Sequence, residues 1–302
     1  MFRKLVRTRA AKDQLSPLTG HAPPTDGALF DIGLLRSRSR FENEAAIRSL
    51  CRTVRISENT ILCRALGRYK MFVDPTDEGL SPHLMLDGIW ELWTTEAILG
   101  FVQAGMTVID VGANLGYYTL LLADLVGAEG RVHAAEPNPR MMSYLHRSLR
   151  VNGLQDRVSL HTAPVAGQAG ERVVLHVPST LPQNAFITAV SQDTPNPHAL
   201  ATTTVDDIVG DGPVDFIKID ADGAEQSIWQ GMRHVLARRR PLVVFSEFTP
   251  ARYDDPAAFL RQMLETGFAL AIVDLSEGVK PTTPEIVLDG SQNDDRMLVF
   301  AR

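Results

Sequence analysis

The sequence predicts an α/β fold with a mostly parallel sheet, and three observations lead to that prediction. From about residue 90 onward, short apolar runs rich in β-type residues alternate with helical stretches, as in βαβ units. A glycine-containing turn follows the first of these runs, and acidic residues follow the ends of three others. Because parallel sheets bind ligands at the carboxyl ends of their strands, the same pattern predicts a site there.

Composition divides the chain into three regions. Residues 1–40 contain prolines, glycine and an Arg/Ser run with little apolar periodicity, so we expect a flexible basic segment. Residues 41–89 form an N-terminal extension, with one or two helices over 41–66 and a short strand at Tyr69–Val73. The extension is a candidate lid or acceptor-binding region, and residues 90–302 form the main domain.

The main domain is expected to alternate strands with helices. The expected strands are Thr107–Val111, Arg131–Ala135, Val158–Thr162, Val173–Val177, Val214–Ile219, Leu242–Phe248, Ala269–Val273 and Met297–Phe300. The expected helices are Tyr117–Val126, Pro139–Val151, Ala224–Ala237 and Pro256–Glu265. The connection between the last two strands has no helical pattern, so we expect these strands to form an antiparallel pair at one edge.

Composition and charge exclude several classes of protein. No apolar run reaches the roughly 18 residues of a membrane-spanning helix, and the basic start lacks the apolar stretch of a secretory signal. Cys51 and Cys63 match no disulfide or zinc pattern, which favours free thiols in a reducing, cytoplasmic setting. Residues 1–70 carry 14 Lys and Arg against 6 Asp and Glu, whereas residues 71–302 carry 16 against 30. An acidic body argues against nucleic acid as a partner.

The first site-forming segment is VIDVGANLGYYT, residues 108–119. Asp110 ends a strand, and Gly112, Asn114 and Gly116 form a turn into a helix. Small residues let the backbone approach a ligand closely, and the following helix N-terminus favours a carboxylate or phosphate. The G-x-N-x-G spacing differs from the G-x-G-x-x-G of dinucleotide-binding proteins. The turn alone is therefore weak evidence of a cofactor.

The second segment ends the next strand with Glu136, which follows Asp110 by 26 positions. At this spacing an acid reaches the ribose hydroxyls of a nucleoside bound over the first turn. A carboxylate accepts both hydroxyl hydrogens, so the residue type suits that task. The alternative is an acid that only stabilises the positive end of the next helix. Together with the first turn, the spacing favours the ribose interpretation.

Two further strands also end in acids. Asp220 ends the run VDFIKID, with Asp222 and Glu225 just beyond it, and Glu247 lies near the end of PLVVFSEF. Acids at these strand ends are candidates for catalysis. Glu225 is equally explained as an acid in the first turn of a helix, and Glu247 as a salt-bridge partner at the sheet edge.

Taken together, these segments resemble the FkbM-type family of S-adenosylmethionine-dependent methyltransferases. The resemblance covers roughly residues 68–302, and its motifs are DVGANLGYYT, EPNP, TTVDDI, IKIDADGAE and SEF, with DGIWELWTT before them. It implies a Rossmann-like class I methyltransferase fold. The expected sheet has seven strands, mostly parallel, with an antiparallel C-terminal edge strand. The implied activity is O-methylation of a hydroxyl on a sugar, polysaccharide or secondary metabolite.

The resemblance also implies roles for single residues. Asp110, Gly112, Asn114 and Gly116 would line the methionine and ribose part of the cofactor, and Glu136 would hold the ribose hydroxyls. Asp220 would lie beside the sulfonium and the acceptor. Two departures occur: Asp222 stands where the family usually has Glu, and Gly167 stands where an acid is frequent. The resemblance therefore assigns no adenine contact.

The chemistry requires that the acceptor hydroxyl lose its proton. Asp220 and Glu247 are the catalytic candidates, because paired acids have pKa values pushed apart and one then serves as a base. The alternative is a Mg²⁺ ion held by the same two carboxylates. Other classes left open are a nicotinamide-dependent oxidoreductase and a non-catalytic module with a similar pocket.

Several other residues receive a functional and a structural interpretation. Tyr117 and Tyr118 either pack on the ligand or belong to the helix core. Trp90 and Trp93, with Glu91, form the edge of a lid over the cofactor, or the two tryptophans are simple packing. His83, in a segment expected to be flexible, is either a base or a surface residue.

Overall fold

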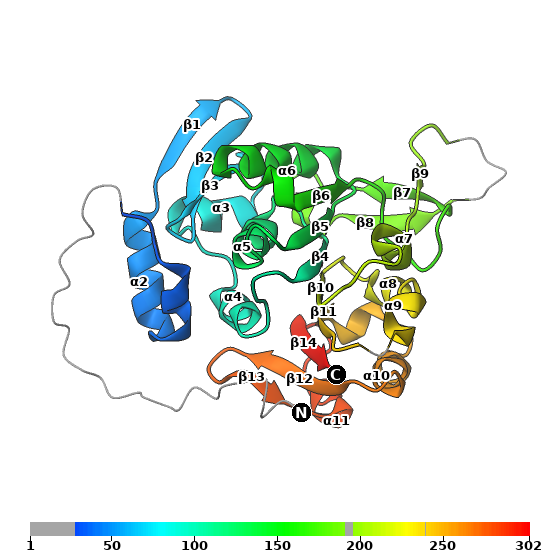
Figure 1. The fold of residues 1–302 in the computed structure, drawn as a ribbon. Coiled ribbons are helices and arrows are strands. Elements are labelled where there is room, and N and C mark those ends of the chain that lie inside the picture. The colour runs from blue at the N-terminus through cyan, green and yellow to red at the C-terminus, as the bar shows by residue number, and fades with distance from the viewer. Residues whose placement is uncertain (1–27, 191–195, 239) are drawn as a thin grey trace.

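A computed structural model describes residues 28–190, 196–238 and 240–302. Its centre is an eight-stranded sheet (Figure 1). In spatial order the strands are β13 (Gly278–Pro281), β12 (Ala269–Asp274), β14 (Arg296–Ala301), β11 (Val243–Phe248), β10 (Phe216–Ile219), β4 (Thr107–Val111), β5 (Arg131–Ala135) and β6 (Val158–His161). The five strands from β11 to β6 run parallel, and β14 is antiparallel to both of its neighbours. The predicted α/β class I methyltransferase fold is thereby confirmed.

The antiparallel end of the sheet differs from the prediction in three details. Strands β12 and β14 pair as predicted, but β14 lies inside the sheet, between β12 and β11. An eighth strand, β13, forms a hairpin with β12 and becomes the edge. The connection from β13 to β14 also contains a short helix, α11 (Pro284–Leu288), which Thr283 caps. Strand β14 is buried along most of its length, and this suits an internal strand.

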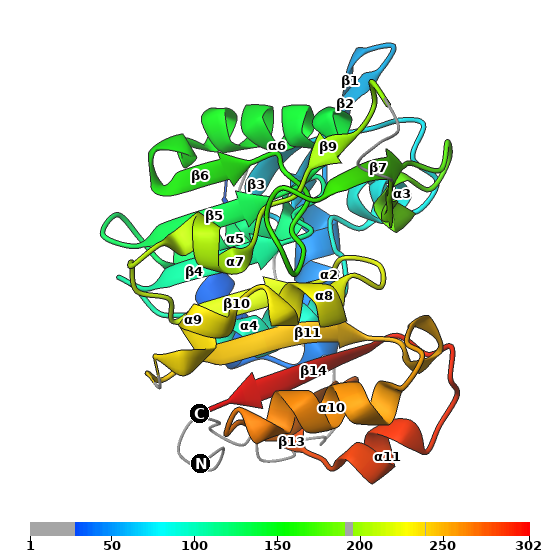
Figure 2. The same cartoon turned by 90° about the vertical axis from the view of Figure 1, so that its right-hand side faces the viewer.

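Helices cover both faces of the sheet (Figure 2). One core contains side chains of α4 (Leu92–Leu99), α5 (Tyr117–Leu125) and α6 (Pro139–Asn152). The other contains side chains of α8 (Glu225–Gln230), α9 (Arg233–Ala237) and α10 (Pro256–Glu265). Successive residues of β10 enter opposite cores, since Phe216 belongs to the first and Ile217 to the second. The short helix α7 (Val205–Val209) contributes Val205 to the second core.

Local sequence fixes the ends of these helices. Asn138 caps α6 by accepting from the amide of Arg140, Pro139 occupies the first turn, and Gly153 ends the helix at φ 68°. The predicted helix Ala224–Ala237 is instead divided into α8 and α9. The division falls at Gly231, where a Cβ atom would lie 2.2 Å from the carbonyl oxygen of Ala166. A close backbone approach therefore interrupts this helix.

A second, antiparallel sheet lies beside the main one. It consists of β8 (Phe186–Ala189), β7 (Arg172–His176) and β9 (Leu200–Ala201), and the short turn η3 (Pro182–Asn184) lies between β7 and β8. Another short turn, η2 (Gln155–Arg157), precedes β6 of the main sheet. The predicted strand Val173–Val177 corresponds to β7, so it exists but does not join the main sheet.

The N-terminal extension contains a helix and a third sheet. Helix α2 (Arg40–Leu50) is followed by β1 (Thr53–Ser57), β2 (Thr60–Ala65), β3 (Tyr69–Val73) and α3 (Leu80–Leu86). The prediction of helices throughout 41–66 was therefore wrong after Leu50. Ile61, Cys63 and Ala65 alternate with more exposed residues, and this period of two is that of a strand.

The described part of the first 40 residues corrects another prediction. The turn η1 (Ile32–Arg36) is capped by Asp31, and Phe30, Ile32 and Leu35 are buried in the first core. This stretch is therefore part of the fold rather than a flexible segment. Residues 1–27 lie outside the described residues. No helix in the described ranges is both long and apolar enough to cross a membrane.

Candidate cofactor and acceptor site

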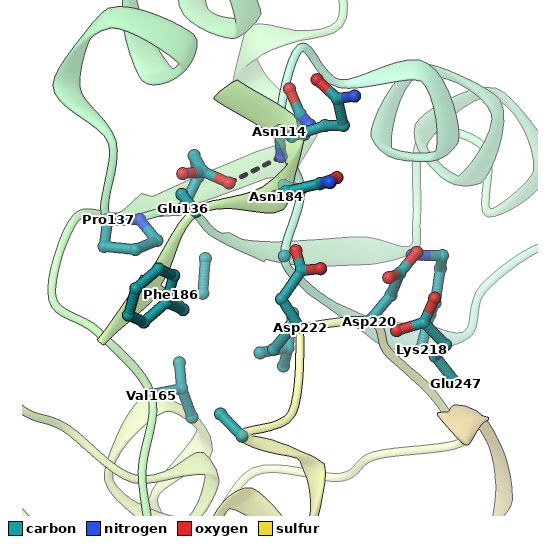
Figure 3. Close-up of a pocket in the computed structure, with 18 of the residues that line it drawn as sticks. Asn114, Glu136, Pro137, Val165, Asn184, Phe186, Lys218, Asp220, Asp222 and Glu247 are labelled. Atoms are coloured by element: carbon teal, nitrogen blue, oxygen red, sulfur yellow. Dashed lines mark hydrogen bonds and ion pairs between the residues drawn. The ribbon is translucent and has the colours of Figure 1, made fainter. Parts of the chain in front are cut away.

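A cavity of about 280 Å³ opens at the carboxyl ends of β4, β5, β10 and β11. Figure 3 shows Asn114 and Glu136 at one end and Lys218, Asp220 and Glu247 at the other, with Asp222 between them. Parallel sheets bind their ligands at this position. The cavity thus brings together the acids and the turn that the sequence placed on four separate strands.

The turn after β4 needs its glycines for two different reasons. Gly112 has φ 78°, and a Cβ atom there would lie 1.7 Å from the backbone oxygen of Asp220. Gly116 has φ 92°, and a Cβ atom there would lie 2.3 Å from Cδ1 of Leu145. Gly112 and Asn114 line the cavity, whereas Gly116 lies behind the turn and lets α5 begin against α6.

Asp110 supports the site from below. Its side chain is buried, and Oδ2 accepts a 2.6 Å hydrogen bond from Oγ1 of Thr119. Its Oδ1 lies 4.0 Å from Nζ of Lys218. Burial raises the pKa of Asp110. Gly112 and Asn114 line the cavity, but Asp110 is not among the described residues that do. The prediction that Asp110 lines the cofactor site is therefore not met by this cavity.

Glu136 ends β5 with both carboxylate oxygens engaged. One accepts from the amide of Asn114 and the other from the amide of Asn138, each at 2.8 Å. The side chain lines the cavity, and burial raises its pKa to about 7. Each carboxylate oxygen can accept a second hydrogen bond, so the group remains able to bind hydroxyls.

The opposite end of the cavity is rich in carboxylates. Asp220, Asp222 and Glu247 all line it, together with Arg252 and Asp295. Arg252 lies 2.5 Å from Glu247 and 3.2 Å from Asp222. Burial and the charge of Asp220 raise the pKa of Glu247 to about 9 and that of Asp222 to about 7. Glu247 therefore faces the cavity. It also makes a salt bridge, the alternative interpretation, with Arg252 of the turn η4 (Pro250–Arg252).

Two charged residues of this site were missed by sequence reasoning: Lys218 and Arg252. Lys218 is buried within β10, where it contacts Asp220 at 2.9 Å. A lysine inside the otherwise apolar run FIKI is the signal that could have identified it. Arg252 carries no comparable pattern, because it acts from a surface turn that only the fold places beside Glu247.

The structure also shows where the aromatic residues that had two interpretations lie. Tyr117 and Tyr118 are both buried on α5 and both line the cavity, so neither interpretation excludes the other. The hydroxyl of Tyr118 donates to Glu91 at 3.0 Å. Trp90 lines the cavity, while Trp93 is partly buried against the first core.

His83 and Glu225 make contacts that support the fold around the cavity. His83 belongs to helix α3 rather than a flexible segment, and its ring lies 5.4 Å from that of Trp90. Glu225 accepts from the amides of Ala221 and Gly223 and from the hydroxyl of Tyr253. It therefore fixes the loop that carries Asp220 and Asp222.

Comparison with known families adds to this geometry. The model of the FkbM methyltransferase domain matches residues 110–270, more than half of the chain. A protein-L-isoaspartate O-methyltransferase of Aeropyrum pernix is 37% identical over 76 residues, which are 25% of this chain and 28% of that protein. A tRNA wybutosine-synthesizing protein 2 homolog of Danio rerio is 42% identical over 65 residues, 21% of this chain and 15% of that protein. The chain thus matches less than a third of the length of either relative.

Two solved structures are also similar. An FkbM methyltransferase of Methylobacillus flagellatus is 17% identical, with 72% of this chain and 52% of that chain covered at a TM-score of 0.42. An S-adenosylmethionine-dependent O-methyltransferase of Thermotoga maritima is 13% identical, with 83% and 85% covered at a TM-score of 0.40. The family match does not favour a nicotinamide-dependent oxidoreductase. This chain belongs to the FkbM methyltransferase family.

Proposed function

We propose that this enzyme transfers a methyl group from S-adenosylmethionine to a hydroxyl oxygen of a sugar, polysaccharide or secondary metabolite. The observation that carries the proposal is the shared cavity, in which Glu136, the acid expected to bind the ribose, lies opposite the carboxylates Asp220 and Glu247. A methyl donor and a group that takes up the hydroxyl proton would then act side by side.

The lining of the cavity fits the parts of the cofactor. Pro137, Val165 and Phe186 provide an apolar slot beside Glu136, suited to the adenine ring (Figure 3). Glu136 would accept from the ribose hydroxyls. The amino-acid part would pass over Gly112, where no side chain has room. The positive sulfonium would then face the carboxylate end of the cavity, where the charges are complementary.

The catalytic role of the carboxylates follows from the reaction. The hydroxyl oxygen attacks the methyl carbon in line with the departing sulfur, its proton passes to a carboxylate, and S-adenosylhomocysteine leaves. Alignment of the reactants can contribute roughly 7–11 kcal/mol to the lowering of the barrier. Asp220 and Glu247 are the proposed bases, and the raised pKa of Glu247 makes its ionised form a stronger base than an ordinary glutamate.

The acceptor end also supports a polyhydroxylated acceptor. Asp220, Asp222, Glu247 and Asp295 offer oxygen acceptors there, and sugar hydroxyls are donors. Among the described residues no group of three or more His, Cys, Asp or Glu could hold a metal ion. A chelator added to the methyl-transfer assay tests the Mg²⁺ alternative directly. The proposed partner is a small molecule or glycan rather than nucleic acid.

A methyl-transfer assay tests this proposal. Labelled S-adenosylmethionine is incubated with a panel of sugars, polysaccharides, hydroxylated metabolites and amine-bearing acceptors, with and without chelator, and transferred label is measured. Asp220→Asn should lower the rate by roughly 10²–10⁴-fold while the affinity for S-adenosylhomocysteine changes little. Asp211→Asn, at an exposed position, is the matched control. Transfer to nitrogen acceptors only, or an unchanged rate in Asp220→Asn, would contradict the proposal.

A further inference from the structure

Lys218 is a cation enclosed in the centre of the fold. Its side chain is 1% exposed, and its neighbours Ile217 and Ile219 in β10 are also buried. Removing an ammonium group from water is costly unless partners compensate it. The identity of those partners therefore indicates what the lysine does.

The partners of Lys218 come from three different elements. Its Nζ lies 2.9 Å from Oδ2 of Asp220, which follows β10, and 4.0 Å from Oδ1 of Asp110 on β4. It also lies 4.7 Å from the ring centroid of Tyr118 on α5, in a cation–π contact. Burial lowers the pKa of Lys218, but the carboxylates of Asp220 and Asp110 outweigh burial and raise it, so the ammonium stays charged.

Tyr118 is itself held from the other side. Its hydroxyl donates to Glu91 at 3.0 Å, and Glu91 lines the cavity with φ 37°, a strained conformation for a residue other than glycine. Glu91, Tyr118 and Lys218 therefore form a continuous support that ends at Asp220.

The buried ammonium of Lys218 has more than one carboxylate beside it. One ammonium faces two carboxylates, of which Asp110 is fully buried and Asp220 lines the cavity. Without the lysine, these two carboxylates would repel each other. With the lysine beside both, Asp220 is the carboxylate of the pair that lines the cavity.

We propose that Lys218 is a positioning residue that fixes the Asp220 carboxylate toward the methyl group of the cofactor. Its ammonium binds Oδ2, and among the described residues Oδ1 of Asp220 makes no hydrogen bond, so that oxygen is free to face a ligand. This inference rests on the proposed function through the role given to Asp220.

The test uses binding and needs no acceptor. Sinefungin, a cofactor analogue with an amine in place of the methyl-bearing sulfonium, is compared with S-adenosylhomocysteine by calorimetry. The wild-type enzyme should prefer sinefungin by about tenfold, the effect of one charge-assisted hydrogen bond. Asp220→Asn should lose the preference. Asp110→Asn, which leaves the Lys218–Asp220 pair intact, should keep it.

The decisive variant is Lys218→Met combined with Asp110→Asn, since the second change removes the carboxylate that would otherwise be buried without its cation. It should bind S-adenosylhomocysteine but prefer sinefungin by less than threefold. Lys218→Arg is the second variant, because it keeps the charge and changes the geometry, and it should also weaken the preference.

A wild-type preference in both Lys218 variants would overturn the proposal. Failure of the wild type to bind S-adenosylhomocysteine would instead contradict the proposed function. The two failures are therefore distinguishable.

Discussion

Glu136 shows how one buried carboxyl can link a cofactor to pH. Its two oxygens hold the amides of Asn114 and Asn138, and burial raises its pKa to about 7. A raised pKa means that this group stabilises the fold most below the pKa of the unfolded state, near 4.5. That contribution is lost as the pH rises through 7. Ribose hydroxyls donate to the ionised form, so bound cofactor should reverse this preference.

The affinity for S-adenosylhomocysteine should therefore rise by about tenfold from roughly pH 6 to pH 8, as the ionised fraction of Glu136 grows. Glu136→Gln should remove this dependence, and Glu129→Gln, at an exposed position, should keep it. Calorimetry across the pH range measures both. A flat wild-type profile, or a steep one in Glu136→Gln, would show that the ribose does not bind this carboxyl.

Gly112 provides a second prediction at the same scale. Alanine there would meet the backbone oxygen of Asp220 at 1.7 Å and would also occupy φ 78°. We expect Gly112→Ala to cost about 1–3 kcal/mol of unfolding free energy and to abolish cofactor binding, since the turn must move. Gly267→Ala is the control, because Gly267 also has a positive φ, 89°, but a Cβ atom there would meet nothing within 4 Å. It measures the cost of backbone strain without a steric clash. Wild-type binding in Gly112→Ala would contradict this account.

Single residues also show what the sequence could and could not reveal. Sequence patterns identified the cavity residues that follow an apolar strand or lie near its end, because parallel strands bring such positions to one edge. These residues are Gly112, Asn114, Glu136, Asp220 and Glu247. Arg252 was not identifiable, since a surface turn carries no periodicity that reports its neighbours. Asp110 was expected in the cavity, yet strand alternation points its side chain at Lys218 beneath the turn.

At the scale of elements, local signals predicted the main domain better than the extension. Helix α6 and strands β4 and β5 begin or end at Asn-Pro, glycine and acidic residues that act within a few positions. The hairpin β1–β2 was taken for helix because Val54, Ile61 and Leu62 fit a helical face as well as a strand. The pairing of β2 with β3, on the side of β2 away from β1, resolves that ambiguity.

The stretch before α2 carries a testable consequence. Phe30, Ile32 and Leu35 are buried in the first core, and burial of each such side chain contributes about 1.5–3 kcal/mol. A chain beginning at Ala28 keeps all three side chains and is the reference for unfolding in urea. A chain beginning at Phe41 should lose several kcal/mol, on the order of 5, by the same measure. Equal stability of the two shortened chains would show that these side chains do not support the core.

At the scale of the whole molecule, the cavity is a joint product of separate parts of the chain. Leu80 comes from the extension, Glu136 and Asp220 from the main sheet, and Phe186 from the second sheet (Figures 1 and 3). The strand ends of the parallel sheet provide Glu136, Asp220 and Glu247, whose motifs are short and local. The second sheet adds Phe186 beside Glu136, and the extension adds Leu80, so this part of the lining depends on how segments far apart in the sequence pack together. Sequence patterns therefore predict the strand-end residues better than the rest of the cavity.

The most direct test of this account is a crystal structure of the enzyme with S-adenosylhomocysteine. The account predicts the ribose hydroxyls on Glu136, the adenine between Val165 and Phe186, and the sulfur directed at Asp220. A ribose placed away from Glu136, or a sulfur directed away from both Asp220 and Glu247, would contradict it.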